Sequence, residues 1–419
     1  MTETTTVPQD SPTATPTWNV GSRRARRNER RLFLRVQPAA WLLIQYAQRR
    51  NRDVCRIPGL GYVVSGAEVA REVVTDGATY AKAGASSSTT VITQMLGPVA
   101  LVNMPDIEHL ALRRQLQDLF TPKYSRQIID AVLGDLVVDL RARLAAGETV
   151  DLVHFSHVLT GSVICHLNGM QLEGEALERR ATEMYEIGLQ IARLVPLRMK
   201  RLDEATVALG HELLDRLLEG VEESFRSGGP DTIPGRLRTL GLTYEQARGV
   251  IAMIILAGTE TTSTAIPRIT ALLHDTGQWE RLRAHPELLD ATIDEGLRIV
   301  APVPLVTRSV AHDHKLRGVQ LRKDRLILTF LTSALRDPRV IKDGNSFDIG
   351  RETPRPLRHL HFSAGAHFCL GFSFAKREIA IVLEALRDLD APVEVVARTA
   401  ARNVLLPSYA SLHIRQVRS

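Results

Sequence analysis

One short stretch of the sequence concentrates side chains that can bind a metal. Residues 359–371, HLHFSAGAHFCLG, contain His359, His361, His367 and Cys369. Imidazole nitrogens and a cysteine thiolate are ligands for zinc and for iron. The pattern therefore raises two questions: which of these side chains binds a metal, and what chemistry the metal supports.

Zinc is one alternative, because His359 and His361 are two residues apart and so are His367 and Cys369. Structural zinc sites usually support small domains that lack a sufficient core. A chain of 419 residues, 44% of them hydrophobic, is not short of core. The stretch also leads directly into a predicted helix, GFSFAKREIAIVLEALRDL, whereas a small structural zinc site would end in a compact turn.

A haem iron with one cysteine ligand accounts for more of the pattern. Cys369 stands where the next helix begins, and there the helix dipole and backbone N–H groups stabilise a thiolate. Gly365 and Gly371 flank it, and glycine lets the backbone approach a flat macrocycle without a Cβ collision. Because a thiolate ligand favours O–O cleavage, the stretch predicts oxygen chemistry.

The hydrophobic pattern indicates the elements that position this stretch. From residue 105 onward, apolar residues recur mainly at helical spacing, and strand-like pieces occur in GYVVSG, RLILTFLT and VEVVAR. The predicted fold is mainly α with small β-sheets. Residues 1–30 are expected to form a disordered, basic arm and residues 31–419 a single domain.

The positive charge of the chain is concentrated near its N-terminus. Ten arginines and one acid, Glu29, lie between Arg23 and Arg52, although the formal net charge of the whole chain is only +6. Nucleic-acid binding needs basic residues spread over a folded face, so we do not predict it. No apolar run reaches the roughly 20 residues of a membrane span, and three distant cysteines fit a reducing cytoplasm.

One predicted helix carries a polar break inside an apolar stretch. It starts at a capping box formed by Thr243 and Gln246 and runs to Asp275. Residues 250–257 are apolar on every side, which is typical of a buried helix. Residues 258–262, GTETT, follow directly, although glycine and an unpaired carboxylate both destabilise a buried helix. A functional reason is therefore expected.

Taken together, these motifs resemble the cytochrome P450 family over roughly residues 35–419. The haem-binding loop of the family is matched by Phe362-x-x-Gly365-x-His367-x-Cys369-x-Gly371. The other motifs follow the family order: His109-x-x-x-Arg113, Ala257-Gly258-Thr259-Glu260-Thr261, Glu295-x-x-Arg298 and FDIGR at 347–351. The sequence departs from the family at Ser363, where glycine is usual, and at Leu335, where asparagine is frequent.

The resemblance implies a cofactor site for haem b, iron protoporphyrin IX. Cys369 would be the axial iron ligand, with Phe362 beside its sulfur, and Gly365, Gly371 and Ala257 would border the cofactor. The haem propionates would be bound by His109, Arg113, Arg308 and His367. Two propionates on a buried haem need cationic partners, which is the physical reason for this group of residues.

The resemblance also implies roles for two pairs on helices. Glu260 would relay protons and Thr261 would hydrogen-bond the bound oxygen, while Gly258 leaves space for oxygen in a locally opened helix. Glu295 and Arg298 would be structural, with Arg351 or, as an alternative, His359 as their further partner.

The implied activity is that of a soluble, bacterial-type haem-thiolate monooxygenase. It would insert one oxygen atom of O2 into a medium-sized lipophilic substrate by hydroxylation or epoxidation. The substrate would be a secondary metabolite or a terpenoid, steroid or fatty-acid-like molecule. Its pocket would be lined by 83–103 and by later segments around Ile254, Val303–Val306 and 404–412, under a lid at 184–200.

Electrons would come from outside the chain, because it has no flavin motif and too few cysteines for an iron–sulfur cluster. The expected donors are an external ferredoxin and a ferredoxin reductase. The ferredoxin would dock on a basic face made by Arg113, Arg114, Lys376 and Arg377. Two alternatives stay open: a peroxide-driven or oxidative-coupling haem-thiolate enzyme, and a non-enzymatic haem-binding accessory domain.

Overall fold

The computed structural model describes residues 21–49, 53–82, 89–104, 106–195 and 201–417. Its helices are α1 (Arg23–Val36), α2 (Pro38–Arg49), α3 (Ala67–Thr75), α4 (Thr89–Leu96), α5 (Asp106–Leu116), α6 (Pro122–Ala145), α7 (Leu152–Leu167), α8 (Gly174–Leu194), α9 (Glu204–Leu217), α10 (Val221–Ser227), α11 (Ile233–Thr239), α12 (Tyr244–Thr276), α13 (Trp279–Ala284), α14 (Leu289–Val300), α15 (Leu331–Ala334) and α16 (Phe372–Arg387). Short 3-10 turns are η1 (Gln117–Phe120), η2 (Pro286–Leu288), η3 (Arg355–Leu357), η4 (Leu360–Phe362) and η5 (Gly365–His367).

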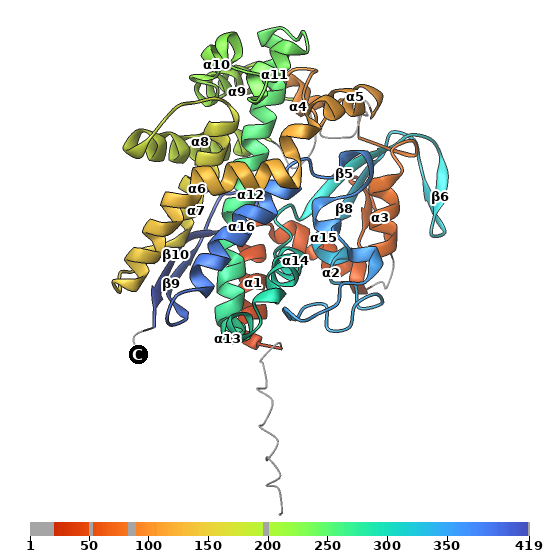
Figure 1. Cartoon of the computed structure of the whole chain (residues 1–419). Helices are drawn as coiled ribbons and strands as arrows, with labels where there is room; N and C mark the ends of the chain where they lie inside the picture. The colour runs from red at the N-terminus through yellow and green to blue at the C-terminus, as the bar shows by residue number, and fades with distance from the viewer. Residues whose placement is uncertain (1–20, 50–52, 83–88, 105, 196–200, 418–419) are drawn as a thin grey trace, which may run out of the picture.

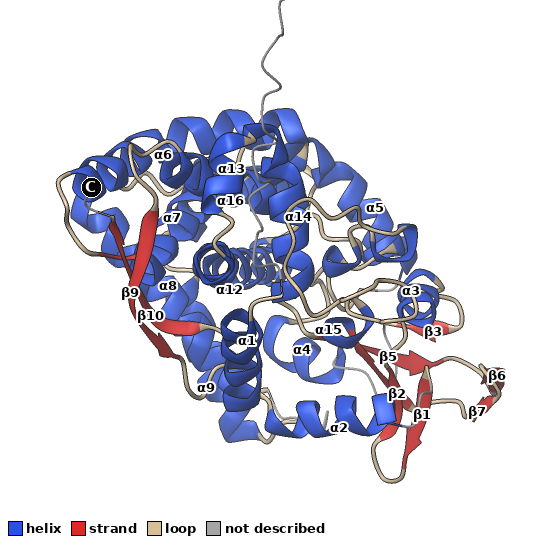
Figure 2. Cartoon of the chain, turned by 90° about the horizontal axis from the view of Figure 1, so that it is seen from below, coloured by secondary structure: helices blue, strands red, loops and turns tan. Residues whose placement is uncertain are grey.

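The strands form small sheets beside the helices. They are β1 (Val54–Ile57), β2 (Gly61–Val64), β3 (Tyr80–Ala81), β4 (Val150–Asp151), β5 (Leu305–Val310), β6 (His314–Leu316), β7 (Val319–Leu321), β8 (Leu326–Phe330), β9 (Val393–Ala400) and β10 (Tyr409–Gln416). The sheets have the orders β1-β2-β8-β5-β3, β4-β10-β9 and β6-β7. Figure 2 shows the first sheet and the β9–β10 pair on opposite sides of α12. The predicted class, mainly helical with small sheets, is confirmed.

The long helix α12 runs through the centre of the molecule and packs against α7, α8, α14 and α16 (Figure 1). The predicted capping box of Thr243 and Gln246 is present, and Gly277 ends the helix in the left-handed conformation. The helix is continuous through residues 258–262, so the predicted local opening is not observed. Hydroxyl groups there donate to carbonyl oxygens one turn back, as Thr259 does to Ile255 and Ser263 does to Thr259. The polar residues are thereby accommodated inside an intact helix.

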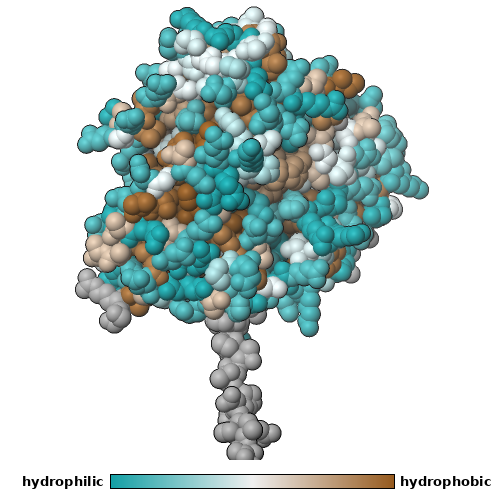
Figure 3. Space-filling model, viewed as in Figure 1, coloured by the Kyte–Doolittle hydropathy of each residue, from teal (hydrophilic) through white to brown (hydrophobic). Residues whose placement is uncertain are grey.

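Among the helices that the structure describes, α12 is the one that length and composition would allow to cross a membrane. In this fold, however, 61% of its apolar window is buried inside the protein. The face of the molecule shown in Figure 3 is mostly hydrophilic, with hydrophobic side chains in scattered patches. The apolar character of α12 is accounted for by its central position in the core.

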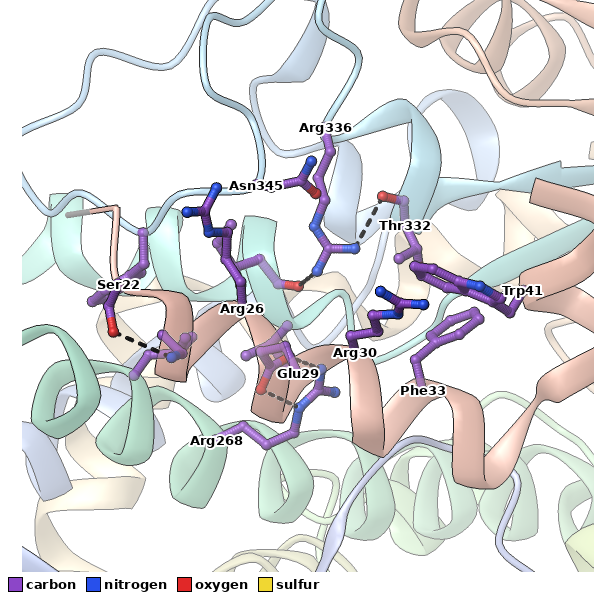
Figure 4. A pocket seen from close by; sticks show the side chains of 15 residues that line it. Ser22, Arg26, Glu29, Arg30, Phe33, Trp41, Arg268, Thr332, Arg336 and Asn345 are labelled. Atoms are coloured by element: carbon purple, nitrogen blue, oxygen red, sulfur yellow. Dashed lines mark hydrogen bonds and ion pairs between the residues drawn. The ribbon is translucent and has the colours of Figure 1, made fainter. Parts of the chain in front are cut away.

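The first helix corrects the predicted N-terminal boundary. Residues 23–30, assigned to a disordered arm, form the first half of α1, which Ser22 caps. Glu29 pairs with Arg268 of α12 at 2.5 Å, and both side chains are nearly buried (Figure 4). Ala25, Leu32 and Phe33 supply its buried apolar face. The high arginine content concealed this amphipathic pattern.

Candidate functional site

The loop before α16 is held in a tight conformation around Cys369. The Cys369 N–H donates to the Phe362 carbonyl oxygen at 2.9 Å, which closes the loop on itself. Ser363 has φ 68° and ψ −161°, a region that is essentially reserved for glycine. Serine at this position therefore stores strain of about 1–3 kcal/mol, which explains why glycine suits the loop better.

The thiol of Cys369 lies just before the N-terminus of α16. Burial raises its pKa, whereas a backbone hydrogen bond from Gly371 and the charge of Arg113 act in the opposite direction. The free thiol is therefore protonated, and a bound cation is needed to stabilise the thiolate fully. A backbone amide donor and a guanidinium charge acting on the sulfur are groups that can stabilise a metal-bound thiolate.

A cluster of basic side chains lies close to Cys369. His109 and Arg308 are almost fully buried, and the His109 ring stacks on that of His367 with centroids 4.2 Å apart. Burial, together with the charges of His109, Lys82, Arg308 and Arg113, lowers the pKa of His367 to about 3. Burial and Arg308 likewise lower the pKa of Lys82 to about 7. The four predicted propionate ligands are thus brought together.

This basic cluster fits the two carboxylates of a haem. Buried cations that depress one another's pKa values are stabilised by an anionic partner, and charge-assisted pairs with propionates would supply it. Lys82 was not predicted from the sequence. It follows β3, whose Ala81 pairs with Ser309 of β5, and this pairing brings it beside Arg308. A β3 strand of two residues leaves too weak a pattern for sequence analysis to detect.

Three further residues assigned to the site, Ala257, Glu260 and Thr261, lie on α12, which packs against α16. Ala257 is exposed although the helix on either side is largely buried, and the Thr261 hydroxyl donates to its carbonyl oxygen at 2.7 Å. Burial raises the pKa of Glu260 to about 7, against a backbone hydrogen bond from Leu406. A carboxyl group that titrates near neutral pH can both donate and accept a proton there.

The three glycines assigned to the site have different surroundings. A Cβ on Gly258 would lie 2.6 Å from Ile164 Cδ1, so this glycine accommodates a side chain of α7, and its role in leaving space for oxygen stays a prediction. A Cβ on Gly365 would lie 2.9 Å from the Thr75 Cα, and Gly365 also has φ +68°. Gly371 alone among them faces open space. The roles of Gly365 and Gly371 beside a flat ring stay predictions.

Glu295 and Arg298 form a buried network that ties α14 to the segment before the cysteine loop. Two guanidinium nitrogens of Arg298 donate to the Glu295 carboxylate at 2.6 and 2.8 Å, and both side chains are 1% exposed. Arg351 Nε donates to Glu295 at 3.2 Å, so Arg351, not His359, lies in the network. Arg298 also donates to the carbonyl oxygen of Leu335. That bond uses backbone, so it does not depend on the side chain at position 335.

Comparisons with known proteins agree with this arrangement. The family described as Cytochrome P450 matches residues 270–386. The putative cytochrome P450 YjiB of Bacillus subtilis is 27% identical over 329 residues, which cover 75% of this chain and 80% of the relative. The crystal structure of CYP109E1 from Bacillus megaterium with testosterone has a TM-score of 0.74 at 23% identity, covering 93% of this chain and 100% of that one. The chain belongs to the cytochrome P450 family.

Further relatives place the protein among monooxygenases. The 6-deoxyerythronolide B hydroxylase of Saccharopolyspora erythraea is 27% identical over 285 residues, which cover 66% of this chain and 67% of the relative. The protein is thus a cytochrome P450 monooxygenase, an oxidoreductase, with the fold of that family. Membership implies a haem with a cysteine thiolate ligand.

The four side chains considered as zinc ligands do not meet at one place in the structure. Within the described residues, His359 and His361 approach Asp294, with ligand atoms less than 4.8 Å apart, whereas His367 stacks on His109. Lys376 Nζ lies 3.0 Å from Asp294 Oδ1, so a cation already occupies this carboxylate. Burial lowers the pKa of His361 to about 3, and the charges of His359, Lys376 and Arg298 contribute. This positive environment disfavours a divalent metal.

The basic face expected for a ferredoxin is weaker than predicted. Arg377 pairs with Asp130 at 2.6 Å and with Glu384 at 2.8 Å, and Lys376 pairs with Asp294. Arg113 is half-buried and acts on Cys369, while Arg114 is exposed. Much of the predicted positive charge is therefore compensated within the fold.

Part of the expected substrate pocket lies outside the described residues. These are 83–88 of the predicted wall and 196–200 of the predicted lid. The described part of the predicted wall and lid includes α4 and the C-terminal half of α8, from Met184 onward. The turn that donates to Glu260, at Leu406, belongs to the predicted wall at 404–412. The candidate proton-relay residue and one predicted wall segment are thus in direct contact.

Proposed function

We propose that this P450 binds haem b through Cys369 and inserts one oxygen atom of O2 into a medium-sized lipophilic substrate. The observation that carries the proposal is the buried basic cluster beside Cys369. Lys82, His109, Arg113, Arg308 and His367 are held close to a thiol that has its own amide donor. A non-enzymatic haem-binding domain would not need a carboxyl group poised near neutral pH on α12.

The roles of the residues follow from their positions. The Cys369 sulfur would bind the iron, and the basic cluster would pair with the propionates and fix the ring. Haem, when bound, supplies the activation of O2. Glu260 would carry protons between the Leu406 turn and the α12 surface at Ala257. Thr261 would offer its hydroxyl by exchanging the bond that it now donates to the Ala257 carbonyl oxygen.

The substrate class is proposed from the relatives. The name of one relative contains 6-deoxyerythronolide B, and one similar structure, that of CYP109E1, is described as a complex with testosterone. We infer a substrate of similar character, such as a secondary metabolite, terpenoid, steroid or fatty-acid-like molecule, that is hydroxylated or epoxidised. Few polar contacts are expected to position it.

Turnover by the purified holoprotein tests the proposal directly. A compound that shifts the haem spectrum is incubated with O2, NADPH, a surrogate ferredoxin and its reductase. We expect a product that carries one atom from 18O2. Product formed from hydrogen peroxide alone, with none from O2 and the reductase system, would instead identify a peroxide-driven enzyme. Binding of haem without product under either condition would favour the accessory-domain alternative.

Replacing Glu260 with glutamine should remove a pH-dependent step. Because burial raises the pKa of Glu260 to about 7, the proton-donating form is lost as the pH rises through 7. We expect coupled product formation by the parent enzyme to decline above that pH. Glu260→Gln should lower turnover by about 100-fold and abolish this inflection.

The matched control for this experiment is Glu245→Gln, which changes an exposed carboxyl on the first turn of the same helix. It should keep both the rate and the pH profile of the parent. An unchanged profile in Glu260→Gln would show that another group supplies the proton.

We also propose that electrons are supplied by an external ferredoxin and its reductase in the cytoplasm. Lys376 and Arg377 of the predicted basic face are paired internally, and Arg113 is half-buried. Of the four residues of that face, Arg114 is therefore the one that is exposed to guide docking. Reduction by an acidic ferredoxin should slow by a few fold between low and physiological ionic strength. Arg114→Gln should reduce that slope, whereas Arg179→Gln on α8 should not. A rate independent of salt would contradict electrostatic docking.

A further inference from the structure

A cavity of about 230 Å³ lies between α1, α12, α14 and the segment that follows β8 (Figure 4). None of its lining residues belongs to the proposed haem site. Four arginines and a single glutamate line it: Arg26, Arg30, Arg268, Arg336 and Glu29. Its remaining walls are largely apolar, with Phe33, Trp41, Leu272, Val300 and Phe347 among them. The cavity thus combines positive charge with an apolar surface.

The single acid in the lining is already engaged. Glu29 Oε2 accepts from Arg268 Nη2 at 2.5 Å, and its other oxygen accepts from Arg268 Nε at 3.4 Å. Arg268 is 2% exposed and also donates to the Pro407 carbonyl oxygen. This ion pair neutralises one arginine in the floor. Figure 4 shows it beneath the other guanidinium groups.

The other three arginines are bonded to backbone or to an aromatic ring. Arg336 donates to the carbonyl oxygens of Ile299 and Thr332. Arg26 donates to the Gly21 carbonyl oxygen, and the Arg30 guanidinium lies 5.3 Å from the Trp41 ring centroid. Because these partners are neutral, they do not cancel the positive charge of the three guanidinium groups.

The environment of Arg336 shows the electrostatic consequence. Burial and the charges of Arg298 and Arg268 together lower its pKa to about 10, although the charge of Glu29 acts in the opposite direction. An anion in the cavity would offset that repulsion, and guanidinium groups match the geometry of carboxylate and phosphate oxygens. Arg26 and Arg30 are exposed on α1, so an anion can reach them from solvent.

From these observations we propose that the cavity binds a small organic anion. Its carboxylate or phosphate group contacts Arg26, Arg30 and Arg336, and a ring or short chain packs against Trp41 and Phe33. A volume of about 230 Å³ is below the roughly 300–1,000 Å³ of drug-sized ligand sites, so the ligand is small. The ligand joins α1 to the segment of Asn345 and Phe347, which is next to Ser346 in the Arg298 network.

Isothermal titration of the holoprotein with four probes tests this site. Phenyl phosphate and benzoate distinguish a phosphate from a carboxylate ligand. Inorganic phosphate measures the binding contributed by the charge alone, and benzyl alcohol measures the binding contributed by the apolar ring alone. We expect one of the two aryl anions to bind at one site, at least about tenfold more tightly than inorganic phosphate. Benzyl alcohol should not bind measurably.

Two double variants of α1 provide the matched comparison. Arg26→Gln/Arg30→Gln removes two cavity arginines, whereas Arg27→Gln/Arg31→Gln removes two neighbouring exposed arginines that do not line it. Both variants lose the same charge from the same helix. The first should weaken aryl-anion binding by about tenfold or more, and the second by less than about threefold.

Three outcomes would overturn the proposal. Absence of binding to the parent protein at millimolar probe would show that the cavity is not an anion site. Equal losses in the two double variants would indicate a general attraction of anions to the basic helix. A spectral change of the haem that matches the binding curve would place the probe in the substrate pocket. The haem spectrum and turnover of both variants report separately on the proposed monooxygenase.

Discussion

Cys369→Ser is expected to yield a folded protein without the spectroscopic signature of a haem thiolate. Burial already raises the pKa of the Cys369 thiol, and a serine hydroxyl in the same place ionises far less readily. The Gly371 amide and Arg113 would then face a neutral oxygen, which is a weak iron ligand. The reduced carbon monoxide adduct should therefore lack the red-shifted Soret band, and turnover should fall by at least about 100-fold.

The control for this variant is Cys165→Ala. Cys165 is buried in α7, and burial raises the pKa of its thiol to about 11, so it is a structural side chain. This variant should keep the thiolate Soret band and the activity of the parent. Circular dichroism of Cys369→Ser should remain that of a helical protein. A Cys369→Ser protein with an unchanged carbon monoxide spectrum would rule out Cys369 as the iron ligand.

Features with strong local signals were predictable from the sequence. The capping box of Thr243 and Gln246 defined the start of α12, because that signal depends only on residues three apart. The i,i+3 spacing of Glu295 and Arg298 placed both on one helix face, and the structure pairs them there. The strands β2, β8 and β9 coincide with the predicted apolar runs.

Features that depend on long-range packing were not predictable. The missing Cβ of Gly258 leaves space for Ile164 of α7, and Glu29 forms an ion pair with Arg268. The two residues of each pair are separated by roughly a hundred residues or more. Thr262, which sequence analysis did not assign, is hydrogen-bonded to Glu378 of α16, whose pKa burial raises to about 8. A single sequence carries no signal for which distant segments meet. The cofactor motifs and the local Glu295–Arg298 pair were recognisable, whereas pairs between distant segments emerged only from the fold.

The second large effect is expected at the centre of the Arg298 network, with Glu295→Gln. The glutamine side chain keeps one carbonyl acceptor but removes the negative charge that two arginines share. Arg298 would remain buried with carbonyl partners only, at Leu335, Gly344 and Ser346. Breaking a buried ion pair in this way costs about 3–5 kcal/mol, a large part of the stability of a typical domain.

Urea unfolding and the ratio of haem to protein measure this loss and separate it from an effect on catalysis. Glu295→Gln should unfold at a lower urea concentration and bind haem substoichiometrically, because the network holds the segment that leads into the cysteine loop. Asp139→Asn, which alters an exposed i,i+4 pair with Arg143, should change stability by less than about 1 kcal/mol. His359→Ala should behave like that control, since Arg351 and not His359 contacts Glu295. A Glu295→Gln holoprotein with parental stability but reduced turnover would instead show that the network acts on the reaction and not on the fold.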